Sequence, residues 1–471
     1  MAGKYIPLGA NTYNGNAYGF PSVLLENWFA EEAGDRNDRP YRLLPTPGLT
    51  SFASGLNGAI RGMIQSDGLL DSKAVIAAGS RVYSMTSAGA TVEIGTITGT
   101  DEARFAGSQS DMVMTAGGVA FVVTTGLAPI SIPGATGNIV DCAELAQRHL
   151  FIEEGSGRFW YSDTAQPASV PATNFATTES ESDQLVGIRV VGDVVYLIGT
   201  RTTELWEYTG SKDIPFRPIQ GAVAKIGIFA KGAVTEADGG LFALGRDQDG
   251  NEVVYRIQNA QPVRISTYPI DRLIAEVTEE NRPSIRLSAH GWGGHSFIGL
   301  HLPSVGDYFY DISNGTWHRR KELAESRYLV QHFFAAFGEK FAGDVTVGTV
   351  YRLDLDVYTH NLKTVRRVAS TIIPVTDSRP TINNLTVEMQ GGVGLVTGQG
   401  QNPKVMLRWA VNGRTFSNEL TTTFGLEGEF GHRAVFDSLG ELYPPAVAIN
   451  IAVTDPVNAT VTGLVINRDR L

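Results

Sequence analysis

The acidic residues are the first side chains in this sequence that could do chemistry. Hydrolysis of a glycosidic bond needs two carboxylates that face each other across the substrate. Four acids at the ends of apolar runs or in turns are candidates: Glu153, Glu154, Glu204 and Asp311. Their spacing singles out no pair, and carboxylates at such positions are ordinarily solvated. The acids therefore predict turns, and we assign no catalytic residue.

Two segments carry side chains that bind metals in other proteins. His290 and His295 flank a Gly-Trp-Gly-Gly turn, but the sequence places no third ligand nearby, and zinc sites usually have at least three protein ligands. Asp247, Asp249 and Glu252 lie between two apolar runs and lack the regular spacing of a calcium loop. Both segments predict hairpin turns, and we expect no metal site.

Cys142 is the one cysteine of the chain. A single cysteine excludes an internal disulfide framework and a cysteine-based zinc site, so we expect a small buried side chain. P-loop, GxSxG and HExxH patterns are absent from the sequence. We therefore expect no enzyme activity, no cofactor and no cofactor-binding residues.

The charge balance is acidic, with 38 basic and 49 acidic side chains and a net charge of -11. Affinity for nucleic acids comes largely from clustered lysine and arginine, so gripping phosphates is not the expected task. The densest basic runs, Arg319–Lys321 and Arg366–Arg367, predict solvated loops or subunit contacts. An acidic surface would let DNA slide past without adhering.

The elements that position these side chains follow a repeated pattern, which is clearest at Ala74–Ile94. An apolar run ends at Gly79, a second strand has Tyr83 at its centre, and a turn around Gly89 leads to Val92–Ile94. Short runs rich in Val and Ile, broken by Gly, are typical of antiparallel strands joined by tight turns. The 53 glycines and the 42% apolar content suit many hairpins around a full core.

Aromatic residues soon after a turn mark further copies of this unit. The markers are Tyr83, Phe121, Trp160 with Tyr161, Trp206 with Tyr208, Tyr255, Tyr308 with Tyr310, and Tyr351. They recur about every 38 to 54 residues, which matches the four-stranded blade of a β-propeller. Apolar runs such as Val194–Gly199 fit blade sheets that are buried on both faces. We predict an all-β fold with a propeller of about seven blades, or six.

The sequence divides into three parts. Residues 1–44 show no period and predict an N-terminal arm that could close the propeller. Pro45–Leu49 is a stiff turn, and residues 45–365 form the predicted propeller. Residues 366–471 predict a β-sandwich or jelly-roll module. Its expected strands contain the segments LTVEM, VMLRWAV, RAVFDSL, VAINIAV and TGLVI.

Helical spacing of apolar residues predicts one helix at Ile270–Glu280 and a weaker candidate at Cys142–His149. No apolar stretch of the sequence approaches the roughly 20 residues that span a bilayer. The N-terminus lacks the apolar centre of a secretory signal, so we expect the protein to fold in a cytosol.

Two turns are near the Asp-box pattern, in which an acid caps a hairpin and an aromatic packs beneath it. They are DISNGTW, which ends at Trp317, and AVNGRTF, which ends at Phe416. Ser313 and Val411 stand where the usual Asp would be. We expect hairpins without chemistry at both places.

Three stretches together resemble the tail hub proteins of short-tailed phages, also called packaged-DNA stabilisation proteins. The first comprises ENWFAEEA, LLPTPGLTSFA and Arg61-Gly62-Met63, and the second is LHLPSVGDYFYDISNGTWHRR. The third comprises VEMQGGVG, LRWAVNGRTFSNEL, LEGEFGHRAVFDSLG and VTDPVNATVTG. It resembles a C-terminal module of phage structural proteins whose turn reads closer to SDDGGRTW, so Val411 departs from that pattern.

The resemblance implies a structural virion protein that forms a ring, with six copies expected, as the hub or nozzle of the tail. The ring would lie below the portal or its adaptor and carry needle, spike or fibre proteins. It would extend the DNA channel and retain the packaged genome until ejection, without sequence-specific DNA binding. The expected location is the virion tail, assembled in the host cytoplasm, without a membrane-spanning segment.

Two other readings remain open at this point. One is a receptor-binding or glycan-binding tail protein on a propeller, with or without glycan-degrading activity, which opposed carboxylates across the propeller axis would favour. The other is a host-encoded propeller scaffold for protein partners, which predicts a monomer with no affinity for a portal.

Overall fold

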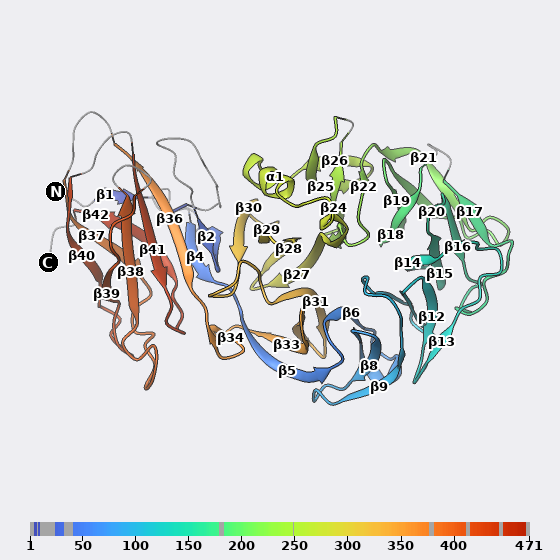
Figure 1. Ribbon diagram of the computed structural model, residues 1–471, viewed down its shortest axis with the longest axis horizontal. Helices are drawn as coiled ribbons and strands as arrows, with labels where there is room; N and C mark the ends of the chain where they lie inside the picture. The colour runs from blue at the N-terminus through green and yellow to red at the C-terminus, as the bar shows by residue number, and fades with distance from the viewer. Residues whose placement is uncertain are drawn as a thin grey trace. The chain divides into compact units, whose positions relative to one another are not determined.

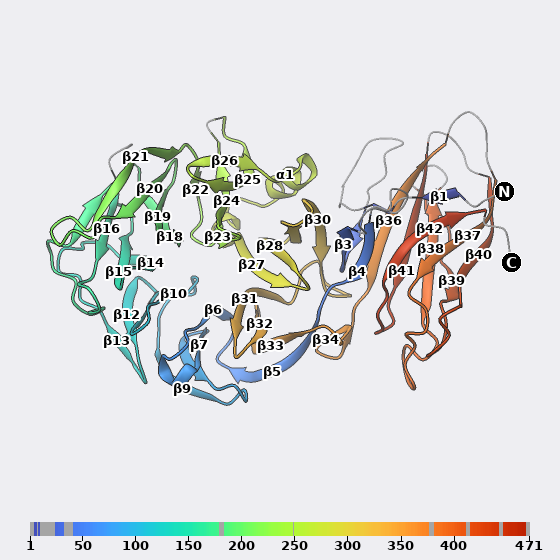
Figure 2. The same ribbon diagram turned by 180° about the vertical axis from the view of Figure 1, so that it is seen from behind.

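The computed structural model describes residues 4–6, 8–9, 24–32, 41–178, 183–247, 249–375, 381–410, 415–441 and 446–467. The protein is 56% strand and 3% helix, which confirms the predicted all-β class (Figures 1 and 2). It has two compact units. The propeller unit comprises Ser51–Val305 and Leu329–Arg352. The sandwich unit comprises Met1–Thr50, Gly306–Tyr328 and Leu353–Leu471.

Seven strands of the propeller unit form a closed ring, and each begins one blade. In ring order they are β6 (Ile60–Gln65), β10 (Arg104–Gly107), β14 (Ile139–Leu145), β18 (Leu185–Val191), β23 (Val234–Ala237), β27 (Arg286–Trp292) and β31 (Val330–Ala336). Each contacts the next, and β31 contacts β6. Among the described residues the ring therefore has seven blades, which decides between the predicted seven and six.

The other strands of each blade follow outward in chain order, except β22, which precedes β23 in the chain and pairs with the same strand, β24. Figures 1 and 2 show the first strands toward the middle of this unit and β9, β13, β17, β21 and β26 at its outside. The first three blades continue with β7 (Ala74–Ala78), β8 (Arg81–Met85), β9 (Thr91–Thr96), β11 (Met112–Ala116), β12 (Val119–Val123), β13 (Leu127–Pro129), β15 (Arg148–Glu153), β16 (Arg158–Tyr161) and β17 (Phe175–Thr177). The fourth and fifth continue with β19 (Val194–Gly199), β20 (Thr203–Tyr208), β21 (Phe216–Ala224), β22 (Gly227–Ile228), β24 (Gly240–Arg246), β25 (Glu252–Gln258) and β26 (Gln261–Arg264). The sixth has β28 (His295–Leu302), and the seventh has β32 (Glu339–Asp344) and β33 (Gly348–Asp354).

The strand that completes the seventh blade is β5 (Gly48–Leu56), which follows β33 in the sheet. Its residues Ala53 and Leu56 are buried with residues of the first and seventh blades. Gly348 makes the close approach possible, since a Cβ there would lie 2.1 Å from the Leu56 carbonyl oxygen. The closing segment thus lies just after the predicted arm 1–44, and it joins parts of the chain that are distant in sequence.

In six of the seven copies, the marker aromatic residues lie on the third strand of the blade, not the second as the repeat unit suggested. Tyr83 lies on β8, Phe121 on β12 and Trp160 on β16. The space between neighbouring blades widens away from the ring centre, so bulky side chains fill it there. Gly62 on the first strand marks the tight inner end, where a Cβ would lie 2.2 Å from the Ala103 carbonyl oxygen.

The sandwich unit consists of two sheets. One contains β3 (Trp28–Glu32), β4 (Tyr41–Pro45), β42 (Val461–Ile466), β37 (Thr381–Met389) and β40 (Ala434–Glu441), and β1 (Lys4–Ile6) also pairs with β42. The other contains β29 (Gly306–Asp311), β30 (Thr316–Arg320), β2 (Leu25–Glu26), β36 (Arg367–Pro374), β41 (Ala446–Val453), β38 (Lys404–Ala410) and β39 (Leu420–Thr423). The short strands β34 (Thr359–His360) and β35 (Lys363–Thr364) pair with each other.

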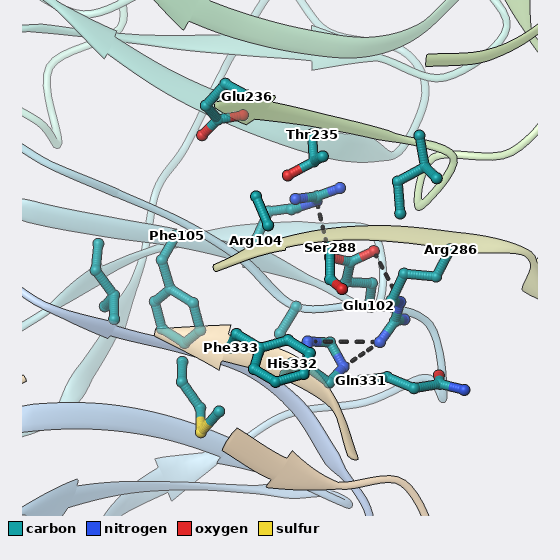
Figure 3. A pocket seen from close by; sticks show the side chains of 16 residues that line it. Glu102, Arg104, Phe105, Thr235, Glu236, Arg286, Ser288, Gln331, His332 and Phe333 are labelled. Atoms are coloured by element: carbon teal, nitrogen blue, oxygen red, sulfur yellow. Dashed lines mark hydrogen bonds and ion pairs between the residues drawn. The ribbon is translucent and has the colours of Figure 1, made fainter. Parts of the chain in front are cut away.

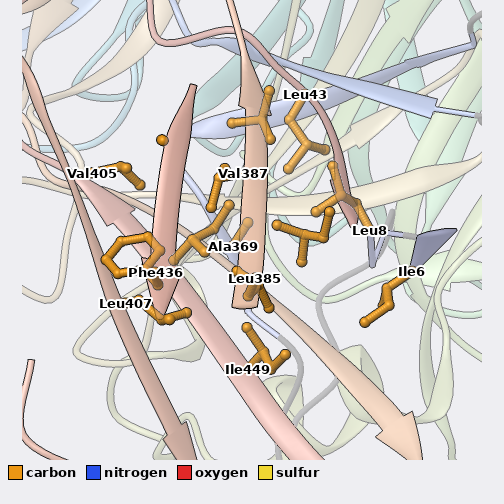
Figure 4. Packing of buried hydrophobic residues seen from close by; sticks show 14 of the residues in the cluster. Ile6, Leu8, Leu43, Ala369, Leu385, Val387, Val405, Leu407, Phe436 and Ile449 are labelled. Carbon is orange, nitrogen blue, oxygen red and sulfur yellow. The ribbon is translucent and has the colours of Figure 1, made fainter. Parts of the chain in front are cut away.

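The two sheets of the sandwich unit enclose an apolar core (Figure 4). Leu385 and Phe436 come from one sheet, and Leu407 and Ile449 come from the other. Face-to-face sheets interdigitate such side chains in a layer about 10 Å thick. Each of the five segments that the sequence predicts as strands beyond residue 380 overlaps a strand of the structure.

The N-terminal residues take part in both sheets of the sandwich unit. Trp28 is fully buried, and its Nε1 donates to the Ala459 carbonyl oxygen over 2.9 Å. The Asn27 Nδ2 donates to the carbonyl oxygens of Lys321 and Arg366. The ENWF segment thus ties the chain start to strands late in the sequence. The predicted division into 1–44, 45–365 and 366–471 stays a prediction.

The helical predictions have two outcomes. Helix α1 spans Tyr268–Ala275. The observed helix therefore begins two residues before the predicted Ile270–Glu280 does and ends five residues before it does. The expected helix at Cys142–His149 is wrong, because these residues belong to the hairpin β14–β15. Its turn has positive φ at Ala146 and Gln147, a conformation that suits a tight hairpin and ends a helix.

Short 3₁₀ helices span Leu70–Ser72 and Arg282–Ser284. No helix within the described ranges is long and apolar enough to cross a membrane.

Candidate functional site

The first strands of the propeller unit enclose a cavity of about 320 Å³ (Figure 3). Its lining comes from β6, β10 with the segment before it, β23, β27 and β31. A second cavity of about 210 Å³ shares Ile64, Arg104, Phe105 and Glu236 with it and extends to β14 and β18. Together they form what we call the axial cavity.

Glu102 lies at the centre of one group of charges in the axial cavity. Its Oε1 lies 3.2 Å from the Arg104 Nε, and its Oε2 lies 3.6 Å from the Arg286 Nε (Figure 3). The Lys231 Nζ donates to the Glu102 carbonyl oxygen over 2.8 Å. Burial by itself raises the pKa of Glu102, but these cations outweigh it and the net pKa is lowered. Glu102 is therefore ionised. Its contacts with Arg104, Arg286 and Lys231 join three blades of the propeller unit.

Arg189 lies at the centre of a second group. Its Nη1 lies 2.6 Å from the Asp141 Oδ2 and donates to the Ile188 carbonyl oxygen over 2.5 Å. Its Nε lies 3.5 Å from the Glu236 Oε2. Burial lowers the pKa of Arg189, but Asp141 and Glu236 more than reverse that effect. Arg189 therefore keeps its charge although its side chain is only 6% exposed.

His332 is the neutral member of the axial cavity. The Arg286 Nη1 donates to its Nε2 (Figure 3). Burial lowers the pKa of His332 well below its ordinary value, and the charges of Arg286 and Arg104 lower it further. A neutral imidazole can accept this hydrogen bond, whereas a protonated one could not.

A serine–histidine pair borders the same cavity. The Ser288 Oγ lies 2.7 Å from the His301 Nε2, and both side chains are buried. A hydroxyl beside an imidazole is one component of an activated nucleophile. Ser288 lies on β27 and His301 on β28, so this hydrogen bond joins two paired strands.

The four acids singled out from the sequence hold turns and strand ends. The Glu153 Oε1 accepts hydrogen bonds from the amides of Thr136 and Gly137, each over 2.7 Å. Burial raises the pKa of Glu153, but these hydrogen bonds lower it below its ordinary value. The other acids accept from nearby donors: Glu154 from Asn138, Glu204 from Trp206, and Asp311 from Ser313.

The candidate metal ligands also have other contacts. The His290 ring stacks on Phe333 with a centroid distance of 4.1 Å, and His295 lies near Phe297. Asp247 accepts hydrogen bonds from the amides of its own turn. In the part of the chain that the structure describes, no group of three His, Cys, Asp or Glu side chains could hold a metal ion.

Cys142 is buried, as the sequence predicted. Burial raises the pKa of its thiol to about 12, so it remains protonated and unreactive at neutral pH.

The predicted exposure of the basic runs is wrong for two arginines. Arg320 is fully buried, lies over the Phe309 ring and has a pKa lowered by burial to about 10. Arg367 is also buried, and its Nη2 donates to the Tyr358 carbonyl oxygen over 2.9 Å. These guanidinium groups pack inside the sandwich unit, where aromatic faces and carbonyl oxygens replace water.

The two Asp-box-like turns have different outcomes. Trp317 is fully buried on β30, and its turn is capped by Asp311 and by Asn314, which accepts from the Thr316 amide. This hairpin is confirmed. In the second turn Val411 lies outside the described residues, and Phe416 beyond it lies near the Arg408 guanidinium.

Sequence reasoning missed the axial cavity because its residues are far apart in the chain. The signal that could have indicated it is an arginine on the first strand of several blades, at Arg104, Arg189 and Arg286. The aromatic residues that mark the repeat lie on other strands of the blades and do not indicate these arginines.

The fold and the site together define a seven-bladed β-propeller that is closed by a strand from the chain start and has a charged axial cavity. The chain matches the phage stabilisation family described as bacteriophage P22 Gp10, beta-propeller, over residues 5–358. It belongs to this family, which confirms the resemblance of its sequence to phage packaged-DNA stabilisation proteins. The family is one of phage structural proteins.

Two solved structures are similar to parts of the chain. The computationally designed Ika8 protein has 12% identity and a TM-score of 0.38, covering 65% of this chain and 99% of its own. BamB from Moraxella catarrhalis has 13% identity and a TM-score of 0.37, covering 65% of this chain and 94% of its own. A comparison with curated proteins gives no match.

Proposed function

We propose that the protein forms a ring in the phage tail, as the hub or nozzle below the portal or its adaptor. Membership of the phage stabilisation family over residues 5–358 is the observation that carries this proposal. In this role the ring extends the DNA channel and retains the packaged genome until ejection. Six copies form the ring, and needle, spike or fibre proteins attach below it.

The propeller acts as a rigid block in this mechanism. Its seven blades are tied in a closed ring, and apolar residues pack between neighbouring blades. The larger part of the axial cavity, about 320 Å³, has the size of a small-molecule site and does not admit a DNA duplex. The DNA channel therefore lies between copies of the chain, along the axis of the ring they form.

The charge of the chain fits such a channel. The net charge is -11, and several of its arginines are buried or paired within the fold. Nonspecific DNA affinity rises with the number of phosphates that cations neutralise. Copies that line a channel with acidic surfaces would let the genome pass without adhering.

The test is a reconstitution on DNA-filled heads that carry the portal but lack a tail. The purified protein is added, the vertex is imaged, and DNA leakage is measured over time. The expected result is a ring at the vertex and slower leakage. A seven-bladed propeller from outside this family, added at equal concentration, is the control. Failure to bind the vertex, with or without its adaptor present, would contradict the hub proposal.

A glycan-binding role would give a different result in the same preparation. The protein would then retain or cleave a surface polysaccharide without binding the vertex. The acids that could have supported that role accept hydrogen bonds from nearby backbone and side-chain donors instead, so the hub has the stronger support.

A further inference from the structure

We propose that the axial cavity binds one small tetrahedral oxyanion, such as phosphate or sulfate, between Arg104, Arg189 and Arg286. The three guanidinium groups come from three different blades and line the connected cavities. Their side chains are 20%, 6% and 19% exposed, respectively. Cations that converge in a partly dry cavity attract an anion more strongly than they would in water.

Several N–H donors of these arginines are incompletely paired. Arg189 Nη2 is buried and has no hydrogen-bond partner among the described residues, and the Nε atoms of Arg189 and Arg286 are also without one. The Nε atoms of Arg189 and Arg286 reach carboxylates only over 3.5 and 3.6 Å. A buried donor without a partner loses its hydration with no compensation, so the cavity favours a ligand that supplies acceptors.

Carboxylates of the axial cavity contact all three arginines. Asp141 lies beside the Arg189 Nη1 and Glu236 lies 3.5 Å from its Nε, while Glu102 lies between Arg104 and Arg286. These carboxylates leave the Arg189 Nη2 without a hydrogen-bond partner among the described residues. The charge of Arg189 lowers the pKa of Arg104, an effect second only to burial. The guanidinium groups of Arg104 and Arg189 therefore repel each other across the cavity that both line. An anion bound between them would offset that repulsion.

A tetrahedral oxyanion matches this geometry. Its oxygens point in several directions and can each accept from a guanidinium fork on a different side. Both cavities, at about 210 and 320 Å³, exceed the volume that one water molecule needs. The chemical class is therefore a small multivalent oxyanion, and inorganic phosphate and sulfate are the probes.

The experiment is a calorimetric titration of the full chain with inorganic phosphate, and separately with sulfate, at constant ionic strength set by chloride. We expect saturation at one anion per chain. Arg189→Lys keeps the charge but removes the fork, so it should weaken binding at least about tenfold. Glu236→Gln removes a competing carboxylate that is 55% exposed, so it should tighten binding several-fold.

Glu207→Gln is the matched control, because Glu207 is an exposed partner of Arg217 on an outer part of the fourth blade. It changes the net charge by the same amount as Glu236→Gln and should leave anion binding unchanged. If Arg189→Lys fails to fold, as circular dichroism would report, the two glutamate variants decide alone. Heats that never saturate, or equal effects of the two glutamate variants, would overturn the proposal in favour of nonspecific screening.

Discussion

The interior of the sandwich unit and the axial cavity of the propeller unit are filled with opposite kinds of side chain. Leu385, Leu407 and Ile449 pack between two sheets in the sandwich (Figure 4). Glu102 and Arg104 lie among other charged groups at the propeller axis (Figure 3). Two sheets can approach until their side chains interdigitate, whereas seven strands around an axis leave a central space.

The difference shows where each unit obtains its stability. The sandwich depends on its central core, in which apolar residues of both sheets pack together. The propeller depends on the apolar contacts between blades, such as Phe159 against Trp206 at 5.1 Å between ring centroids. Its axis is free to hold charged groups that tie the first strands together. The following four substitutions test this contrast, from the largest expected effect to the smallest.

Leu385→Ala should be the most damaging of these changes. The side chain is fully buried in the sandwich core, and removing it leaves a cavity between the sheets. We expect the free energy of unfolding to fall by about 2–5 kcal/mol, measured by urea denaturation. Leu420→Ala, at a residue that is 38% exposed, is the control and should cost less than about 0.5 kcal/mol. Equal losses would mean that the core is not where the sandwich gains its stability.

Glu102→Gln tests the charged axis and should cost about 3 kcal/mol. Removing one partner of a largely buried ion-pair group leaves the other charges uncompensated, here those of Arg104 and Arg286. Chemical denaturation of the propeller unit within the full chain measures the loss. Glu93→Gln removes the partner of Arg81 in a more exposed pair and should cost less than about 1 kcal/mol. If the Glu102 variant is as stable as the Glu93 variant, the axial ion pairs make no net contribution to the free energy of unfolding.

Gly348→Ala tests the closure of the ring and should cost about 1–3 kcal/mol. The added Cβ would lie 2.1 Å from the Leu56 carbonyl oxygen, so β5 must move away from β33. Limited proteolysis should then cut near residues 51–56 sooner than in the unaltered protein. Gly126→Ala, where the nearest atom to a Cβ is 3.8 Å away, is the control. Unchanged cleavage in the Gly348 variant would exclude β5 as the critical closing strand.

The pH dependence of stability should show the role of Glu153. Because hydrogen bonds depress its folded-state pKa, its contribution is complete above the unfolded pKa of about 4.3. That contribution is lost as the pH falls through the folded value. The stability difference between the unaltered protein and Glu153→Gln should therefore shrink below about pH 4. Glu154→Gln, at an exposed residue, should give a smaller and flatter difference, and the reverse order would contradict this assignment.

The sequence predicted the blades better than it predicted their centre. Aromatic residues such as Tyr83 and Trp206 recur at blade spacing, because each blade must fill the same widening gap next to its neighbour. The run Val194–Gly199 was predicted as a strand and is β19. The error at Cys142–His149 arose because a short apolar run does not distinguish a helix from a strand.

The amino-acid sequence by itself determined the all-β class, the repeated blade, the absence of common catalytic motifs and the membership of a phage family. These properties depend on residues that are close together in the chain or recur at a regular interval. Only the tertiary structure decided the seventh blade, the closing strand β5 and the axial cavity. Arg104, Arg189 and Arg286 become neighbours because first strands converge on one axis, a proximity that no local pattern encodes. Likewise, arginine is usually a surface residue, so the sequence predicts exposed side chains at Arg320 and Arg367. Both are buried by the sheets that fold over them.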